Sequence, residues 1–533
     1  MEQAAAIIGV SGILILLVNM ASQKTSHFGS DHFFHLNIIR LIKNNRHRFI
    51  TRYKNFIGNE YTAYPQFFHW VLSFLPFHNP VRLNFIFRSV IFFIDVSFFL
   101  IFFYSGFLQF SSKLPLLTVF LYAALLFIFT PFNFVRWNAG NAGFSPRSMG
   151  VLLGRIFVYL FLFHLHHSGW VYYAALVLIA YIIFISSQFA AQYVLFFCII
   201  YGLVFLNVFV LIIPLLGFCL FYLLHPKVAV NYCKGQYQHK KIYATFFAKR
   251  FILTYRPGIW RDFVYDFWIR VKKEKLAAIP YIQTNAVVTL FWGFTILPMS
   301  LYFLINATVV NHQQNFWELL TNYTLFRILL ITLLIFILTS FSFTRFLGEP
   351  ERYLEFAVPA MIFLFIQSFS SQYIYYTIIY YVLVSVLLIF ISKWYDKKTT
   401  AANNNMLWHI ETGKENGITM MDALQKIKKQ KGALKIFSNN EEISRRLLVI
   451  ENAGFLLPDI AAKKTGSFFY KDIFNKQYPF VNEALLVPMI KEFGINAFVI
   501  DKTPLSRPYT EVLNGLSFKP VFTLGNFILL EVE

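Results

Sequence analysis

Long apolar runs separated by short polar segments fill the first three quarters of the chain. A membrane-crossing helix needs about 20 largely apolar residues, and eleven stretches approach that length. Asn207 and Pro214 interrupt the apolar stretch 190–225, which we interpret as two helices. The predicted helices span residues 4–21, 86–108, 114–133, 149–166, 169–187, 190–206, 208–225, 284–305, 323–343, 354–369 and 373–392. This pattern predicts a polytopic α-helical membrane protein.

The pattern changes after Ile391. Residues 393–533 hold 19 Lys and Arg and 15 Asp and Glu, with charged helix-like stretches and short apolar runs that are typical of strands. We therefore expect a transmembrane domain at 1–392 and a soluble α/β domain at 393–533, which is long enough for a core of its own. Lys393–Asn405 is interpreted as a polar linker between them.

The composition also indicates a membrane protein and limits the kinds of molecule that the chain could bind. The chain of 533 residues is 57% hydrophobic, has a mean hydropathy of +0.56 and carries a net charge of +21. In so apolar a chain, that charge indicates contact with anionic or phosphorylated lipids rather than with nucleic acid. Its three cysteines lie in or beside apolar runs, which excludes a disulfide-stapled module and a Cys-rich zinc site.

The basic residues are distributed unequally between the two sides of the membrane. With eleven crossings, the loops 22–81, 134–148, 226–283 and 344–353 and the C-terminal domain all lie on one face, and nearly all loop Lys and Arg lie there too. The positive-inside rule would place this face in the cytoplasm. If the charge serves a reaction, the rule weakens, so the charge count leaves the orientation open.

Few carboxylates in the membrane region could act as a general base. Residues 1–392 contain eleven acidic residues, and most of those outside the helices lie on the basic face. Asp31 falls in the first turn of an amphipathic helix that GSDHFFHLNIIRLIKNN predicts along the membrane interface. Ser30 or Asp31 could equally cap this helix. Asp31, His32 and His35 could together supply three ligands to a divalent metal, but the fourth ligand of a typical site is missing.

Two segments resemble the GT-C superfamily of membrane glycosyltransferases, which use polyprenyl-phosphate-linked sugars. The long loop after the first predicted helix opens with SDHFFHLNIIRLI and closes with NEYTAYPQFFHWVLSFLP before the second, as in that family, although Gln66 replaces the second proline after Tyr64 and Pro65. FTRFLGEPERYLEFAVPAMIF is similar to the Glu-Arg-aromatic motif of lumenal mannosyltransferases, without its His-Lys pair. The C-terminal domain also resembles that of bacterial, protein-mannosyltransferase-like members. The tryptophan-rich acceptor motif of oligosaccharyltransferases is missing.

The resemblance implies roles for residues of the basic face. Asp31 would be the catalytic base, and cations would stabilise the departing phosphate. His35, Glu60, Tyr64 and Glu351 would position substrate. The arginines expected to bind the donor phosphate are Arg250, Arg256, Arg261, Arg345 and Arg352. Arginine suits bidentate phosphate contacts, although anchoring to anionic lipid explains any single one of these residues as well.

Charges within the apolar runs are a separate group. Asp95 and Arg155 should face the bundle interior and could pair with each other, because each costs roughly 2.5–3.5 kcal/mol inside a membrane. Arg136 and Arg147 lie in RWNAGNAGFSPRSMG between two predicted helices, either in a solvated turn or at an anion site.

Taken together, the sequence predicts an inverting glycosyltransferase. It would move a sugar from a polyprenyl-phosphate donor to a hydroxyl of a glycan, lipid or protein acceptor at the outer face of a bacterial plasma membrane. A lipid-linked glycan flippase would need a similar basic, aromatic cavity, but we find no repeated halves of the kind transporters show. A glycan polymerase or ligase is the third candidate, although its long loop usually comes late in the chain. The missing Asp-x-Asp motif argues against a soluble nucleotide-sugar donor.

Overall fold

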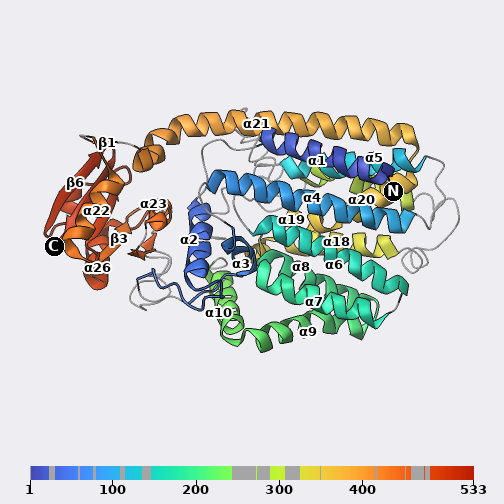
Figure 1. Ribbon diagram of the computed structural model, residues 1–533, viewed down its shortest axis with the longest axis horizontal. Coiled ribbons are helices and arrows are strands. Elements are labelled where there is room, and N and C mark those ends of the chain that lie inside the picture. Colours follow the sequence, from blue (N-terminus) through green and yellow to red (C-terminus); the bar gives the residue numbers. More distant parts are fainter. Residues whose placement is uncertain are drawn as a thin grey trace.

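The structure is a computed structural model of the whole chain. It describes residues 2–22, 30–57, 61–75, 80–107, 115–134, 146–167, 169–242, 272, 289–305, 324–348, 350–412, 414–415, 417–450, 452–457, 473–474 and 480–533. These residues form an elongated helical bundle with a β-sheet region at one end (Figure 1).

Each of the eleven predicted apolar runs contains a helix where the structure describes it. The bundle comprises α1 (Glu2–Ser22), α4 (Pro80–Phe107), α5 (Leu116–Ile128), η1 (Pro131–Phe134), α6 (Arg147–His167), α7 (Trp170–Ser186), α8 (Gln188–Val204), α9 (Val208–Leu224), η4 (Thr289–Gly293), α16 (Ile296–Ile305), α18 (Thr324–Thr339), α20 (Val358–Ser368) and α21 (Ser371–Thr412). Shorter elements at or near its sheet-facing end are α2 (Ser30–Asn44), α3 (Phe67–Ser73), α10 (Pro226–Ile242), η6 (Ser342–Leu347), α19 (Glu351–Leu354) and η7 (Glu355–Ala357).

Four helices within the described residues are long and apolar enough to cross a membrane. They cover Phe85–Ser105, Leu116–Phe134, Arg147–His167 and Ser371–Ile391, and five shorter apolar helices accompany them. The bundle buries 67% of the apolar stretch of Arg147–His167 but only 33% of that of Ser371–Ile391. Exposed apolar surface of this extent indicates lipid contact, so the chain is membrane-associated.

Two separate helices occupy 190–225, as predicted. α8 ends at Val204 and α9 begins at Val208, where the Asn207 side chain accepts a hydrogen bond from the Val210 amide at 3.2 Å. This cap satisfies one of the free amides at a helix start. Pro214 lies inside α9 and does not end it.

The expected linker is helical. Lys393–Asn405 belongs to α21, which runs unbroken from Ser371 to Thr412 and connects the bundle to the sheet region (Figure 1). The stretch contains neither glycine nor proline, the residues that most readily end a helix. Its polar composition therefore marks the end of the apolar part of a helix and not a loop.

A five-stranded mixed sheet forms the C-terminal region. The strands lie in the order β4-β3-β5-β7-β6, with β3 parallel to β4 and β5, and β7 antiparallel to β5 and β6. Their bounds are β3 (Leu434–Ser438), β4 (Ala453–Leu456), β5 (Ala497–Asp501), β6 (Phe518–Leu524) and β7 (Phe527–Val532), with a short hairpin of β1 (Lys414–Glu415) and β2 (Ile418–Thr419). The associated helices are α22 (Met420–Lys431), α23 (Glu441–Arg446), η8 (Leu447–Val449), α26 (Glu483–Phe493) and α27 (Tyr509–Val512).

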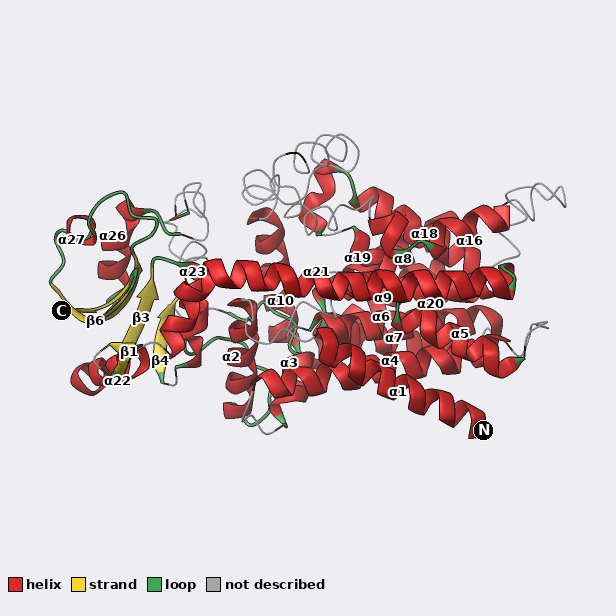
Figure 2. Cartoon of the chain, turned by 90° about the horizontal axis from the view of Figure 1, so that it is seen from above, coloured by secondary structure: helices red, strands yellow, loops and turns green. Residues whose placement is uncertain are grey.

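Residues 30–57 cover one face of this sheet; they are part of the loop that follows the first predicted helix, which is called the first loop below. Successive residues of a strand point to opposite faces, and Ile436 and Phe437 of β3 accordingly belong to two different apolar cores. The core that contains Ile436 also contains Ile38 and Ile42 of α2 and Phe56 of the segment that follows. Figure 2 shows α2 between the strands and the bundle.

Backbone hydrogen bonds strengthen this attachment. The Phe455 amide of β4 donates to the Asn55 carbonyl at 2.8 Å, and the Ile57 amide donates to the Phe455 carbonyl at 2.9 Å. The segment therefore covers the open edge of β4, which would otherwise expose unpaired backbone groups. The amphipathic helix predicted at 30–44 is present, but the sheet region and not a lipid interface buries Ile38 and Ile42. Sequence periodicity shows that a face is apolar without showing what covers it.

Candidate functional site

Asp31 is the second residue of α2. The helix begins at Ser30, so the carboxylate residue falls in its first turn, as expected. A negative charge is favoured there by the helix dipole. The side chain of Asp31 lies outside the described residues, and its role as a base stays a prediction.

A buried histidine pair lies one turn further along α2. His35 Nδ1 is 3.0 Å from Nε2 of His69 on α3, and both side chains are buried. The ring of Tyr64 is 5.3 Å from that of His35 and 5.7 Å from that of His69, measured between centroids. Two of the predicted positioning residues, His35 and Tyr64, thus lie together. His69 was missed because a single histidine within an aromatic run is most often a core residue.

Burial holds His32 and His69 neutral. Burial, together with the electrostatic effects of the nearby His35 and Arg446, lowers the pKa of His32 to about 3. Burial and the nearby His35 also place the pKa of His69 well below its usual 6.5. A neutral imidazole has one donor and one acceptor nitrogen, which permits the direct contact between His35 and His69. Across the described residues, no three His, Cys, Asp or Glu side chains are grouped to hold a metal ion.

Helix α10 packs against the segment that leads to Tyr64. The Tyr61 hydroxyl donates to the Gln238 side-chain oxygen, and the side-chain amide of Asn231 donates to the Thr51 carbonyl at 2.9 Å. Gly235 faces Ala63 so closely that a Cβ atom at Gly235 would lie 2.0 Å from the Ala63 Cβ. Close approach of this kind requires glycine.

The same helix reaches the second predicted motif five residues later. Lys240 lies with its Nζ 5.9 Å from the centre of the Phe346 ring in η6. With the Gln192 side-chain amide oriented to satisfy its neighbours, its nitrogen donates to the Tyr353 hydroxyl at 3.1 Å and its oxygen accepts from the Lys240 ammonium at 2.5 Å. Burial lowers the pKa of Lys240 to about 8, so the side chain remains mostly charged at neutral pH.

The Glu-Arg-aromatic motif forms α19. Glu351 and Tyr353 are buried, and Tyr353 stacks on Phe189 with ring centres 4.5 Å apart. The Arg352 guanidinium lies 5.7 Å from the centre of the same Phe189 ring. The Arg352 guanidinium and the contacts from Lys240 through Gln192 therefore lie around the same pair of stacked rings, Phe189 and Tyr353. Glu351 and Arg352 are therefore near each other, but in a different cluster from His35 and Tyr64.

Paired charges lie behind α19 inside the bundle. Arg155 forms an ion pair with Asp95 and donates to the Glu355 carbonyl at 2.9 Å. Arg147 contacts the Glu355 carboxylate at 3.0 Å. The predicted pairing of Asp95 with Arg155 is confirmed, whereas Arg147 occupies a buried ion pair and not a solvated turn. Each buried charge here has the partner it requires.

Several predicted residues cannot be placed. Glu60, Arg250, Arg256 and Arg261 lie outside the described residues, and so does the side chain of Arg345 in η6. Arg352 is the predicted phosphate-binding residue whose side chain the structure places. The other assignments to donor binding stay predictions.

No family model matches the sequence, and no curated protein matches it. Residue chemistry and geometry therefore carry the functional proposal.

Proposed function

We propose that the chain is an integral-membrane inverting glycosyltransferase that moves a sugar from a polyprenyl-phosphate donor to a hydroxyl acceptor. One observation carries the proposal: the two segments that resemble GT-C enzymes meet the same helix, α10. Gly235 contacts Ala63 beside Tyr64, and Lys240 lies against Phe346 and the Tyr353 network. Gly235 and Lys240 are about 7.5 Å apart along the helix axis, at 1.5 Å per residue.

Each step of the reaction has a candidate group at this end of the bundle. The acceptor oxygen attacks the anomeric carbon while its proton passes to the Asp31 carboxylate. The bond from that carbon to the phosphate oxygen breaks, and the phosphate leaves with the electron pair. Lys240 and Arg352 supply the positive charge that a departing phosphate needs. His35 and Tyr64, whose rings are 5.3 Å apart, would hold the sugar through its hydroxyls.

The site is proposed to face the outer side of the membrane, as the family resemblance implies. The basic residues of this face then bind phosphate and lipid headgroups. Under this proposal they are not insertion signals.

A flippase for lipid-linked glycan is the second candidate. The buried charges Asp95, Arg155, Arg147 and Glu355 favour it, because ionisable residues within a bundle often line transport pathways. A transporter would leave the bond between sugar and phosphate intact, and a glycan polymerase or ligase would require a lipid-pyrophosphate oligosaccharide.

Proteoliposomes that contain purified protein, polyprenyl-phosphate sugars labelled in the sugar and a set of hydroxyl acceptors (glycans, lipids and peptides) distinguish these possibilities, with labelled lipid-pyrophosphate oligosaccharides as the donor in a parallel assay. The proposal predicts release of free polyprenyl phosphate together with labelled product of inverted anomeric configuration. If the labelled lipid moves to the other leaflet but stays chemically intact, the protein is a transporter and not a glycosyltransferase. Transfer that occurs only from lipid-pyrophosphate oligosaccharides would favour the polymerase or ligase.

A further inference from the structure

A polar cavity lies where the sheet region meets α2. Its volume is about 530 Å³, and its walls come from α2, from residues of the following segment between Ile50 and Asn55, and from Ile450, Asn452 and the first two residues of β4. Five asparagines and three basic residues line it, the latter being Arg40, Arg52 and Lys54. No carboxylate is among its lining residues within the described chain. The charged side chains among the described lining residues are therefore all basic.

Two asparagine side chains in this cavity leave adjacent hydrogen-bonding groups unused. Asn55 Nδ2 donates to Asn37 Oδ1 at 2.8 Å. The remaining donor, Asn37 Nδ2, and the remaining acceptor, Asn55 Oδ1, are buried without a hydrogen-bond partner among the described residues. Buried polar groups are normally satisfied. A neighbouring donor and acceptor match sugar hydroxyls, each of which can accept and donate.

The cavity lies against the face of α2 that points away from the bundle core. Asn37, Arg40 and Asn44 recur at intervals of three and four residues and so share one face of α2. Ile39, on average about 150° around the helix from Asn37 and Asn44, packs in the core of the bundle. An occupant would therefore come from the aqueous side, which favours a water-soluble ligand over a lipid headgroup.

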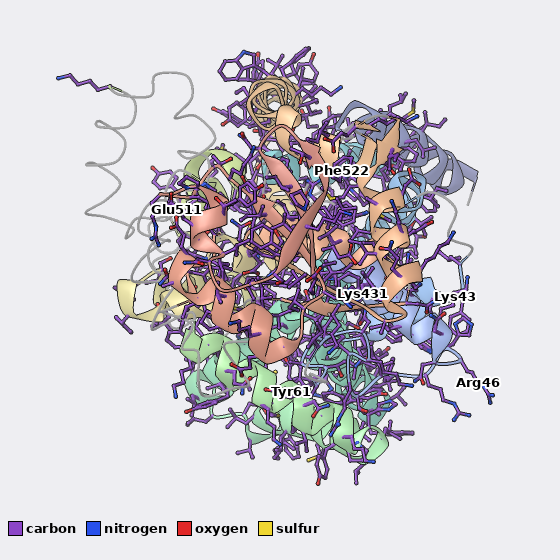
Figure 3. All side chains as sticks on the ribbon, turned by 90° about the vertical axis from the view of Figure 1, so that its left-hand side faces the viewer. Lys43, Arg46, Tyr61, Lys431, Glu511 and Phe522 are labelled. Carbon is purple, nitrogen blue, oxygen red and sulfur yellow. The ribbon has the colours of Figure 1, made fainter. Side chains whose placement is uncertain are left out.

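A second hollow continues the first. It has a volume of about 730 Å³ and shares Ile450 and Asn452 with the cavity at α2. Lys428 and Lys429 of α22 line it. Figure 3 shows Lys431 at the end of the same helix on the side of the molecule where Lys43 and Arg46 project from the end of α2. Together the two hollows offer more room than a single ligand group needs, and the charged side chains among their described lining residues are basic.

We propose that this combined hollow, the α2–sheet cavity, binds an anionic saccharide, that is, a sugar chain carrying carboxylate or phosphate groups. Arg52 and Lys54 would meet the acidic groups, and the Asn37–Asn55 amide pair would meet hydroxyls. Binding at this site goes beyond sugar transfer and does not rest on it. The site nevertheless lies on the helix that carries Asp31, and Asn37 is about 9 Å from Asp31 along the axis.

Binding of tetragalacturonate to the purified full-length chain tests this inference, with cellotetraose as the uncharged probe. Isothermal titration calorimetry should detect binding of tetragalacturonate. Cellotetraose should bind much more weakly or not at all. The double variant Arg52→Gln/Lys54→Gln should bind tetragalacturonate at least tenfold more weakly. Asn37→Ala should weaken it as well, without a change in net charge.

A chain of net charge +21 attracts any polyanion, so a matched control is essential. Lys43→Gln/Arg46→Gln removes the same charge from the end of α2 outside the cavity lining. This control should bind tetragalacturonate like wild type, and all variants should keep the wild-type thermal midpoint. Equal loss in the control and the cavity variant would overturn the proposal. So would variants that change binding to vesicles of anionic lipid but not to tetragalacturonate.

Discussion

Asp95 and Arg155 form an ion pair, which allows two charged side chains to be buried in an apolar bundle. Removing one partner of a buried ion pair costs about 3–5 kcal/mol, because the other charge stays buried without compensation. We expect Asp95→Leu and Arg155→Met each to lower the thermal unfolding midpoint in detergent. The double variant should recover part of the loss, since no lone charge remains. Unchanged midpoints in both single variants would contradict the pairing, and Glu511→Gln on the exposed surface serves as control.

Lys240 gives the proposed donor site a pH dependence. Its pKa of about 8 means that the ammonium form, which would attract the donor phosphate, is lost as the pH rises through 8. The KM for donor should therefore rise about tenfold between pH 7 and pH 9, as expected for one group with that pKa. Lys240→Met should raise the KM at pH 7 and flatten this profile. The exposed neighbour provides the comparison: Lys241→Met should keep the wild-type profile.

At the scale of elements, the contact of α10 with the first loop depends on Gly235. A methyl group there would lie 2.0 Å from the Ala63 Cβ, well inside contact distance. Gly235→Ala should therefore displace α10, lower the thermal midpoint and reduce transfer. Ala63→Gly removes the opposing methyl group and should restore much of both in the double variant. A Gly235→Ala protein with wild-type stability and transfer would show that the two segments do not pack in this way.

Sequence periodicity predicted most elements but not their surroundings. The apolar runs located the bundle helices, and the spacing of Phe34, Ile38 and Ile42 located α2, because a helix must bury such a face somewhere. The continuation of α21 through Lys393–Asn405 was missed, since polar composition alone does not end a helix. The residues that cover α2 are some 400 positions distant in the sequence, and no local pattern carries that information.

At the scale of the whole molecule, the first loop and the sheet region form one packing unit. Ile42 is fully buried in the core that includes Ile436 of β3. Ile42→Asp would bury an unpaired charge, which is strongly unfavourable, and should release the sheet region from α2. We expect rapid proteolysis between the bundle and the sheet region in this variant. Lys43→Asp, at the exposed adjacent position, should remain as resistant as wild type; equal cleavage of both would contradict the shared core.

The candidate site was predictable only in part. His35 and Tyr64 were predicted only as substrate-positioning residues, through the family resemblance, and the structure brings their rings together. Asp31 was expected in the first turn of a helix, because the spacing of apolar residues indicates where that helix begins. His69 and Lys240 were not identified, since their environments arise from α3 and α10 packing against distant segments. Burial is what gives Lys240 its lowered pKa, and burial is a property of the whole fold.

The rate of sugar transfer by Asp31→Asn, compared with wild type, tests the central claim most directly. Asparagine keeps the size and helix-capping ability of aspartate but cannot take a proton. Loss of a general base typically costs about 10²- to 10⁴-fold in rate, so the variant should transfer sugar at least 100-fold more slowly while keeping its thermal midpoint. Glu511→Gln, far from α2, should retain the full rate. Wild-type transfer by folded Asp31→Asn would contradict the account.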